Sequence, residues 1–323
     1  MGGKMKAAQL TAPRSMEIVE VDEPNIQDGE VLVRVEKVSI CGSDLRPFSV
    51  TLPEEQYPVP PGRPTHECAG VVEESRSDAF NPGDRVIAFP FEQGGFRETL
   101  SMSPDNLVAV PQNGSLDTWI MCQPMGTVLY AVNRMGNLID KNIVVLGQGA
   151  IGLSFTRFLS GMACRELITV DLEDYRLDLS TQMGATRTLN PLRENVTDAV
   201  SELTGGIGAD VVVEAAGLHE TVRHAIVLAK QFGSIILFGI THSENFSVDF
   251  KQIRDKDLTM IATSSARTGT MPQFVRQTVH MVDQGRLDPT PLITHHLKAD
   301  QVQEAFLMYE ERRDGIIKVV MEW

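Results

Sequence analysis

Cysteine, histidine and carboxylate side chains gather in the first quarter of the chain. Cys41 follows an apolar stretch that predicts a strand, Ser43 stands two residues later, and His66-Glu67 begins another predicted strand. Zinc takes these ligand types, and a catalytic zinc site keeps one position open. Zinc polarises an alcohol oxygen and eases hydride loss, while a hydroxyl such as that of Ser43 can pass the proton toward solvent. Each residue alone would be ordinary in a core, so this prediction depends on a second motif.

That second motif is a glycine-rich turn at 147–152, read Gly-Gln-Gly-Ala-Ile-Gly. Apolar runs at 143–146 and 167–170 predict strands on either side, and Asp171 follows the second run, 19 residues after the last glycine. Strand, glycine turn, helix, strand and acid is the order of a dinucleotide-binding unit. Gly147 would allow the tight turn, Gly149 the approach of a pyrophosphate, and Gly152 the packing of helix on strand. The predicted coenzyme-binding residues are Gly147, Gly149, Ala150, Ile151, Gly152 and Asp171.

The charges around Asp171 favour NAD over NADP. Asp171 would accept hydrogen bonds from the adenosine ribose hydroxyls, whereas a 2′-phosphate there would meet a like charge. Glu173 and Asp174 add to this repulsion, and Arg176 alone argues against it.

With both motifs in hand, the sequence resembles the medium-chain dehydrogenase/reductase superfamily, in its zinc-dependent alcohol and polyol dehydrogenase branch, which includes the sorbitol and threonine dehydrogenases. The matching motifs run in the family's order over nearly the whole chain: Cys41-Gly-Ser-Asp44, His66-Glu67, Ala69-Gly70, Gly83-Asp84-Arg85-Val86, Gly147 to Gly152, and Pro291-Leu-Ile-Thr-His295. The resemblance implies an α/β protein with a Rossmann doubly wound parallel sheet and a GroES-like β-barrel catalytic domain.

The resemblance also implies roles for individual residues. The family positions for zinc ligands fall on Cys41, His66 and the adjacent Glu67, and the alcohol-contacting hydroxyl falls on Ser43. An acid behind the ligands, here Asp44, usually pairs with a base near the C-terminus, for which Lys318 is the candidate. We therefore expect NAD and one catalytic Zn²⁺ as cofactors.

The sequence departs from the family pattern near these ligands. A further ligand, Cys or Glu in the family, is replaced by Gln123, with Cys122 before it and Thr65 in place of a glycine before His66. Gln is a poor zinc ligand, so Cys122 turns in, water fills the position, or binding is weakened. The four-cysteine lobe is absent from 87–97, which predicts no structural zinc.

Arg46 replaces the relay histidine of the family. Arginine stays charged and cannot act as a base near neutral pH. Arg46 is therefore expected to bind the NAD ribose or phosphates or to clamp an anionic substrate group, the alternative being an ordinary surface arginine. Ser43 and Arg46 are the predicted catalytic residues.

The pattern of elements predicts two domains. Many short strands with close turns before about residue 115 suggest a small β-barrel, and alternating strands and helices follow. We predict a GroES-like domain at 1–120, completed by 266–323, and a Rossmann domain at 121–265. A helix broken by Pro124 is expected at 119–134, a last strand at 258–262, and loop positions for His295 and His296.

Composition limits the function classes. The chain has 323 residues, 42% of them hydrophobic, and a net charge of −14. Without a basic cluster or a long apolar run, nucleic acid and membrane are not expected partners. Four scattered cysteines and no visible signal peptide suggest a cytoplasmic protein with reduced thiols.

Three functions remain open from the sequence. The favoured one is a zinc- and NAD-dependent oxidoreductase acting on a small secondary alcohol or polyol, or the corresponding ketone. A zinc-free reductase of activated double bonds (an enone or quinone reductase) in the same superfamily is the second, and a non-catalytic nucleotide-binding protein is the third. A homodimer or homotetramer is expected, with 258–262 as a pairing edge.

Overall fold

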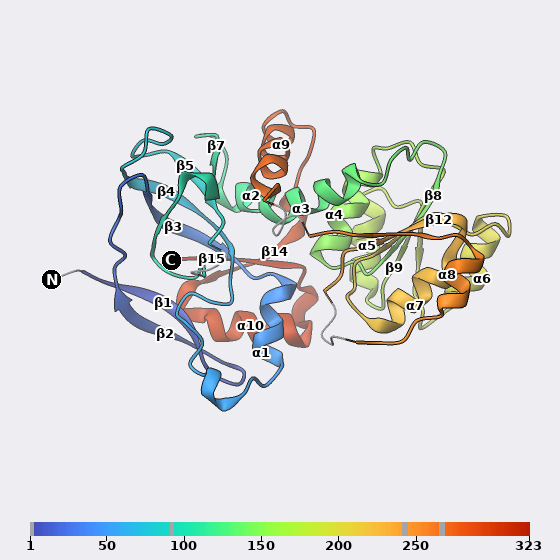
Figure 1. Ribbon diagram of the computed structural model, residues 1–323, viewed down its shortest axis with the longest axis horizontal. Coiled ribbons are helices and arrows are strands. Elements are labelled where there is room, and N and C mark those ends of the chain that lie inside the picture. Colours follow the sequence, from blue (N-terminus) through green and yellow to red (C-terminus); the bar gives the residue numbers. More distant parts are fainter. Residues whose placement is uncertain (1–2, 91–93, 241–244, 265–268) are drawn as a thin grey trace. The chain divides into compact units, whose positions relative to one another are not determined.

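The computed structural model describes residues 3–90, 94–240, 245–264 and 269–323 (Figure 1). They form two compact units. Unit 1 comprises Met1–Gly126 and Pro272–Trp323, and unit 2 comprises Thr127–Met271. The predicted domain boundary at 265/266 lies outside the described residues, and the boundary at 120/121 stays a prediction.

Unit 1 is built on a seven-stranded sheet. Its order is β14-β15-β3-β4-β5-β7, with β6 paired to β3, and β1 and β2 form a separate hairpin. The strands are β1 Lys4–Ala12, β2 Ser15–Asp22, β3 Val31–Ser39, β4 Glu67–Ser75, β5 Arg85–Ala88, β6 Thr99–Met102, β7 Leu107–Val110, β14 Ile293–Lys298 and β15 Lys318–Glu322. In β3 the alternating Val31, Val33 and Val35 are buried, as the period of a half-buried strand predicts. The many short strands confirm the predicted GroES-like barrel.

The C-terminal segment completes this unit. Strand β15 pairs antiparallel with β3, Val320 opposite Ser39. The helices of unit 1 are α1 Leu45–Ser49, α2 Leu116–Ile120, the start of α3 Cys122–Asn133, most of α9 Met271–Asp283, and α10 Val302–Glu311. Rings of Phe48 on α1 and Phe306 on α10 pack with centroids 5.0 Å apart. The helix break lies before Cys122 rather than at Pro124, since a proline in the first helical turn removes no intrahelical donor.

Unit 2 contains a six-stranded parallel sheet of order β10-β9-β8-β11-β12-β13. Its strands are β8 Asn142–Leu146, β9 Glu166–Val170, β10 Arg187–Leu189, β11 Ala209–Glu214, β12 Ala229–Leu237 and β13 Thr259–Ala262, and its helices are α4 Ala150–Leu159, α5 Asp174–Gln182, α6 Val196–Leu203, α7 His219–Leu228 and α8 Phe250–Asp255. Helices α4 and α5 pack together, as do α6, α7 and α8, with the strands between the groups (Figure 1). The predicted Rossmann doubly wound sheet is confirmed.

Strand β12 begins at Ala229, and a bulge carries the exposed Phe232 between its two paired stretches. One local prediction differs from the structure. His295 and His296 lie in strand β14, not in a loop. Among the described residues, no helix has both the length and the apolar character needed to cross a bilayer.

Candidate functional site

Two neighbouring strands of unit 1 bring the predicted metal ligands together. Strands β3 and β4 are antiparallel, with Ser39 opposite Glu67. Cys41, just beyond the end of β3, therefore comes close to His66, just before β4. The ligand atoms of Cys41, His66 and Glu67 all lie within 4.8 Å of one another.

Asp44 is buried behind two of these residues and bonds to both. Its Oδ1 accepts a hydrogen bond from Nδ1 of His66 at 2.9 Å, and its Oδ2 accepts from the backbone N–H of Cys41 at 2.8 Å. Burial opposes a charged imidazole, but the charge and hydrogen bond of Asp44 outweigh it and raise the pKa of His66 well above its ordinary value. With Nδ1 occupied, Nε2 of His66 is the nitrogen left for a metal.

Lys318 contacts Glu67, not Asp44, so the predicted pairing is wrong. Lys318 Nζ donates to Oε2 of Glu67 at 2.5 Å and to the carbonyl of Ile40 at 2.9 Å. The register of β15 on β3 sets Lys318 beside Ile40, and Asp44 is engaged by His66. Burial disfavours the ammonium group of Lys318, but the charge of Glu67 outweighs it and raises the pKa of Lys318.

These residues fit a zinc ion. Thiolate, imidazole nitrogen and carboxylate oxygen are accepted zinc ligands. The second oxygen of Glu67, Oε1, is buried and has no hydrogen-bond partner among the residues that the structure describes. Such an atom is costly unless something binds it, and a cation beside Cys41 and His66 would satisfy it.

Gln123, which stands where the family has a further zinc ligand, is buried together with the preceding Cys122. Cys122 and Gln123 begin α3 and are almost fully buried. Burial raises the pKa of the Cys122 thiol to about 12, which disfavours the thiolate that zinc binds. Among the described residues, Cys122 is not part of the converging group. The structure therefore does not have Cys122 turned in as a ligand. Thr65, in place of the family's glycine, is fully buried.

The two predicted catalytic residues stand on a short helical segment after Cys41. Ser43 is half-buried in the 3-10 turn η1 Gly42–Asp44. Arg46 is exposed on α1, and no ion pair is recorded for it in the part of the chain that the structure describes. Their predicted roles remain predictions.

The glycine turn of unit 2 has the geometry that its motif predicts. Gly147 has φ of +89°, and Gly149 faces open space, so a ligand could approach its backbone. A Cβ on Gly152 would lie 1.8 Å from the carbonyl oxygen of Gly147. Helix α4 begins at Ala150, so its N-terminus faces the turn, where a phosphate binds favourably.

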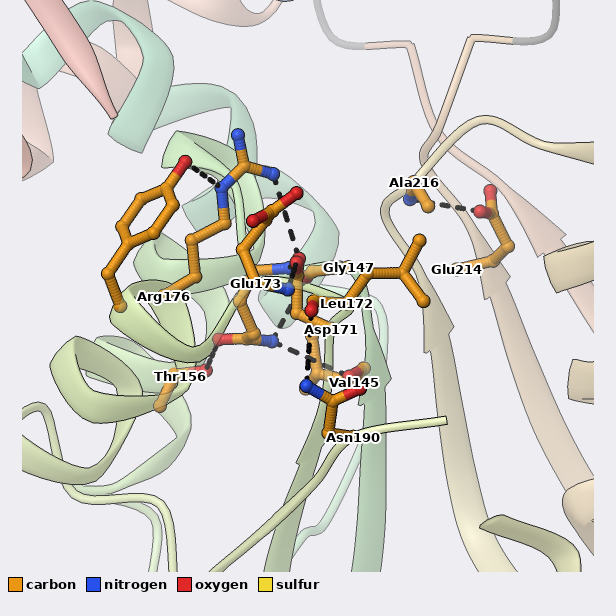
Figure 2. Close-up of polar contacts among 12 residues, drawn as sticks. Val145, Gly147, Thr156, Asp171, Leu172, Glu173, Arg176, Asn190, Glu214 and Ala216 are labelled. Carbon is orange, nitrogen blue, oxygen red and sulfur yellow. Dashed lines mark hydrogen bonds and ion pairs between the residues drawn. The ribbon is translucent and has the colours of Figure 1, made fainter. Parts of the chain in front are cut away.

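Gln148 holds this turn and was not singled out from the sequence. Its side chain is fully buried, with Nε2 donating to the Gly147 carbonyl at 3.0 Å and Oε1 accepting from Thr156 at 2.9 Å (Figure 2). Its backbone N–H donates to Oδ2 of Asp171 at 2.6 Å. The turn, α4 and the acid after β9 thus form one hydrogen-bonded group.

Glu214 fixes the end of β11, the strand next to β8, and the sequence analysis did not identify it either. At the end of β11, its Oε1 accepts from the N–H of Ala216 at 2.9 Å (Figure 2). The same oxygen accepts from the N–H of Gly217 at 2.8 Å and from the Thr221 hydroxyl at 2.7 Å. A carboxylate followed by Ala-Ala-Gly at a strand end was the available signal.

Comparison with known proteins finds two matching family models. A family model described as "Alcohol dehydrogenase GroES-like domain" matches residues 27–112, and one described as "Zinc-binding dehydrogenase" matches residues 150–280. L-threonine 3-dehydrogenase of Chromobacterium violaceum is 27% identical over 99% of this chain and 100% of that protein. An uncharacterised zinc-type alcohol dehydrogenase-like protein of Escherichia coli is 28% identical over 99% of each chain.

Solved structures share the fold. Alcohol dehydrogenase from Thermus sp. ATN1 aligns with a TM-score of 0.88, covering 99% of this chain and 100% of that one at 22% identity. The first family model includes Cys41, His66 and Glu67, and the second begins at Ala150, within the glycine turn, so the two follow the expected order. The chain therefore belongs to the zinc-type branch of the medium-chain dehydrogenase/reductase superfamily.

Proposed function

We propose that the chain is an oxidoreductase that transfers a hydride between NAD(H) and a small secondary alcohol or polyol, or the corresponding ketone. Unit 1 is the catalytic domain and unit 2 the coenzyme-binding domain. The observation that carries the proposal is the convergence of Cys41, His66 and Glu67 in a chain that also has the glycine turn.

Cys41, His66 and Glu67 would hold the zinc ion. When bound, zinc polarises an alcohol oxygen and eases loss of the hydride. Asp44 fixes the ring of His66 through Nδ1 and so orients Nε2. Lys318 neutralises part of the charge of Glu67 in the buried interior.

Ser43 handles the proton in this proposal. Oxidation of a secondary alcohol releases a hydride from carbon and a proton from oxygen, giving ketone, NADH and H⁺. The Ser43 hydroxyl accepts the alcohol proton and passes its own onward, so it is left unchanged. Arginine at position 46 cannot continue such a relay, and the proton would pass directly to solvent.

We assign the coenzyme as NAD. The carboxylate of Asp171 already accepts two backbone N–H bonds at the end of β9. Its remaining lone pairs can accept hydrogen bonds from the adenosine ribose hydroxyls of NAD. NADP carries a phosphate in place of the 2′-hydroxyl and cannot donate this bond.

Arg46 suggests one substrate class. The similar threonine dehydrogenase acts, by its name, on an amino acid with a secondary hydroxyl. An exposed guanidinium three residues after Ser43 could pair with a carboxylate of such a substrate. We expect Arg46→Leu to reduce activity on hydroxy acids far more than on neutral diols. Equal losses on both classes would exclude the clamp.

Metal analysis and turnover test the main proposal together. We expect purified protein to hold close to one equivalent of zinc and to reduce NAD⁺ with at least one alcohol of a panel of secondary alcohols and polyols. Zinc below about a tenth of an equivalent would favour the zinc-free reductase. Binding of NADH without turnover of any alcohol or enone would favour the non-catalytic alternative.

We also propose that the protein forms homodimers or homotetramers in the cytoplasm. Strand β13 is at the edge of the unit 2 sheet, and Met260 on it is exposed. An unpaired apolar edge of this kind favours pairing with a second copy.

A further inference from the structure

Glu214 is a buried carboxylate at the edge of the unit 2 sheet where the glycine turn lies. Its side chain ends β11, the strand next to β8, and the residue is 1% exposed. Ligands of open parallel sheets bind outside the carboxyl ends of the strands. A buried charge is costly unless it is paired and hydrogen-bonded, so a carboxylate at this edge calls for an explanation beyond the filling of a core.

The two carboxylate oxygens of Glu214 face different parts of the chain. Oε1 accepts the backbone N–H groups of Ala216 and Gly217 at 2.9 and 2.8 Å, and these two bonds close the chain after β11 into a turn. Oε2 lies against Gly239, where a Cβ would be only 2.4 Å away from it. The side chain therefore fills the space between the turn after β11 and the chain that follows β12.

The turn that Glu214 closes packs against the glycine turn. A Cβ placed on Gly147 would lie 3.0 Å from both the Cβ and the backbone nitrogen of Ala216, and this nitrogen is the one that Glu214 holds. Strand β8 lies between β9 and β11, so the turn after β8 is supported from both neighbours. Asp171 holds it through the N–H of Gln148 on one side, and Glu214 supports it through Ala216 on the other.

We propose that Glu214 is a positioning residue of the coenzyme site: through Ala216 it holds Gly147 and the glycine turn in the shape that accepts a pyrophosphate, without contacting the coenzyme itself. The proposal rests on the coenzyme function proposed above for the glycine turn. What the position requires is a hydrogen-bond acceptor at the reach of a glutamate side chain. Its negative charge is not required, since a negative charge close to a pyrophosphate is itself unfavourable.

NADH affinity and stability, both measured on the whole protein, test this proposal without turnover. Fluorescence titration gives the NADH dissociation constant, and urea unfolding gives the stability. We expect Glu214→Ala to weaken NADH binding at least about tenfold, because small displacements of positioning groups are costly. Glu214→Gln keeps the length of the side chain and an acceptor oxygen, so its NADH affinity should stay within about threefold of wild type.

Asp210 supplies a matched control on the same strand. It lies near the start of β11, at the end opposite Glu214, and accepts the backbone N–H of Asn142 at 2.9 Å. Asp210→Ala should lower the stability but leave the NADH affinity within about twofold of wild type. If Glu214→Ala does not fold, Glu214→Asp keeps the charge but is one methylene shorter, and should weaken NADH binding at least about fivefold.

The possible results separate this inference from the proposed function. NADH affinity within about twofold of wild type in Glu214→Ala, or in Glu214→Asp where the alanine variant does not fold, would overturn the positioning role. Equal weakening by Asp210→Ala would show a general effect of lost stability, and equal weakening by Glu214→Gln would show that charge is what matters; either result also overturns it. If wild type itself does not bind NADH, the proposed coenzyme site is wrong.

Discussion

Asp44 organises the metal site through contacts that are testable one residue at a time. It bonds to Nδ1 of His66 and to the backbone of Cys41. Loss of such a partner behind a ligand typically costs about 10–100-fold in metal affinity. We therefore expect Asp44→Asn to weaken zinc binding by about that factor, measured by chelator competition. The control is Asp117→Asn, which removes a carboxylate paired with Lys37 in the same unit. Unchanged affinity in Asp44→Asn would contradict the assigned role.

The buried pair of Lys318 and Glu67 predicts a large effect on stability. The side chains are 2% and 0% exposed. Breaking a buried ion pair by removing one partner strands a charge and typically costs about 3–5 kcal/mol. We expect Lys318→Met to lower the free energy of unfolding of the metal-free protein by about this amount, as measured by urea unfolding. Because Glu67→Gln removes the stranded charge, the double variant should recover at least about half of the loss. A double variant as unstable as Lys318→Met would contradict this account.

The candidate metal ligands could be proposed from residue types, but the partner of Lys318 could not be predicted. Cys41 and His66-Glu67 are recognisable because zinc accepts few side chains. Which acid Lys318 reaches depends on the register of β15 on β3, and a shift of register changes every contact. Glu67 and Lys318 are 251 residues apart in the chain. Sequence spacing contains no information on the pairing of strands that are so far apart. The buried Gln148 was missed for a similar reason, since a polar residue in a glycine turn normally reads as exposed.

At the scale of elements, Asp210 connects the starts of three strands in unit 2. It lies in β11, accepts the backbone N–H of Asn142 in β8 at 2.9 Å, and pairs with Lys230 of β12 at 2.7 Å. Burial alone would raise the pKa of Asp210, but the bonds from Lys230 and Asn142 and the charge of Lys141 lower it below its ordinary value of 3.8. The ionised form is therefore favoured by folding.

The sign of the pH dependence follows from this lowered pKa. The stability that Asp210 contributes is fully present above the pKa that its carboxyl has in the unfolded chain. It is lost as the pH falls through the lower pKa of the folded protein. We expect Asp210→Asn to reduce the free energy of unfolding by about 1–2 kcal/mol at neutral pH. The difference in free energy of unfolding between wild type and Asp210→Asn should shrink below about pH 4, because the wild-type carboxyl then becomes protonated and loses the same stabilisation. Urea unfolding at neutral and acidic pH measures this, with Asp178→Asn, exposed on α5, as control. A deficit that is constant with pH would contradict it.

Element types were predictable where local signals agree. The apolar runs of β8 and β9 enclose a glycine turn, so period, length and turn chemistry favour the same answer. The beginning of β12 was not predictable, because Ala229 pairs with Ala209 and a bulge then places Phe232 outside the ladder before pairing resumes at Ser234. Strand β14 was missed because its alternation of half-buried and exposed residues includes two histidines that suggest a loop.

At the scale of the whole molecule, the predicted fold class is confirmed, and the proposed self-association would use one exposed edge. Strand β13 pairs with β12 through Thr259, Met260, Ile261 and Ala262. Thr263 N–H donates to Leu237 of β12, and the Ala262 carbonyl accepts from Arg134 instead. In a parallel strand, alternate residues direct their backbone groups to opposite sides. The backbone N–H of Met260 therefore points away from β12, to the free edge.

This direction makes Met260→Pro a selective test of edge pairing. Proline there removes a donor that a second copy would use and leaves the bonds to β12 in place. We expect wild type to behave as a dimer or larger assembly in light scattering, and Met260→Pro to shift toward monomer at the same protein concentration. Met260→Leu, which keeps the N–H and the apolar side chain, should assemble as wild type does. NADH binding in Met260→Pro should persist, because the glycine turn and Asp171 lie at β8 and β9, away from this edge. A Met260→Pro protein that binds NADH and still assembles like wild type would show that the copies meet through another surface.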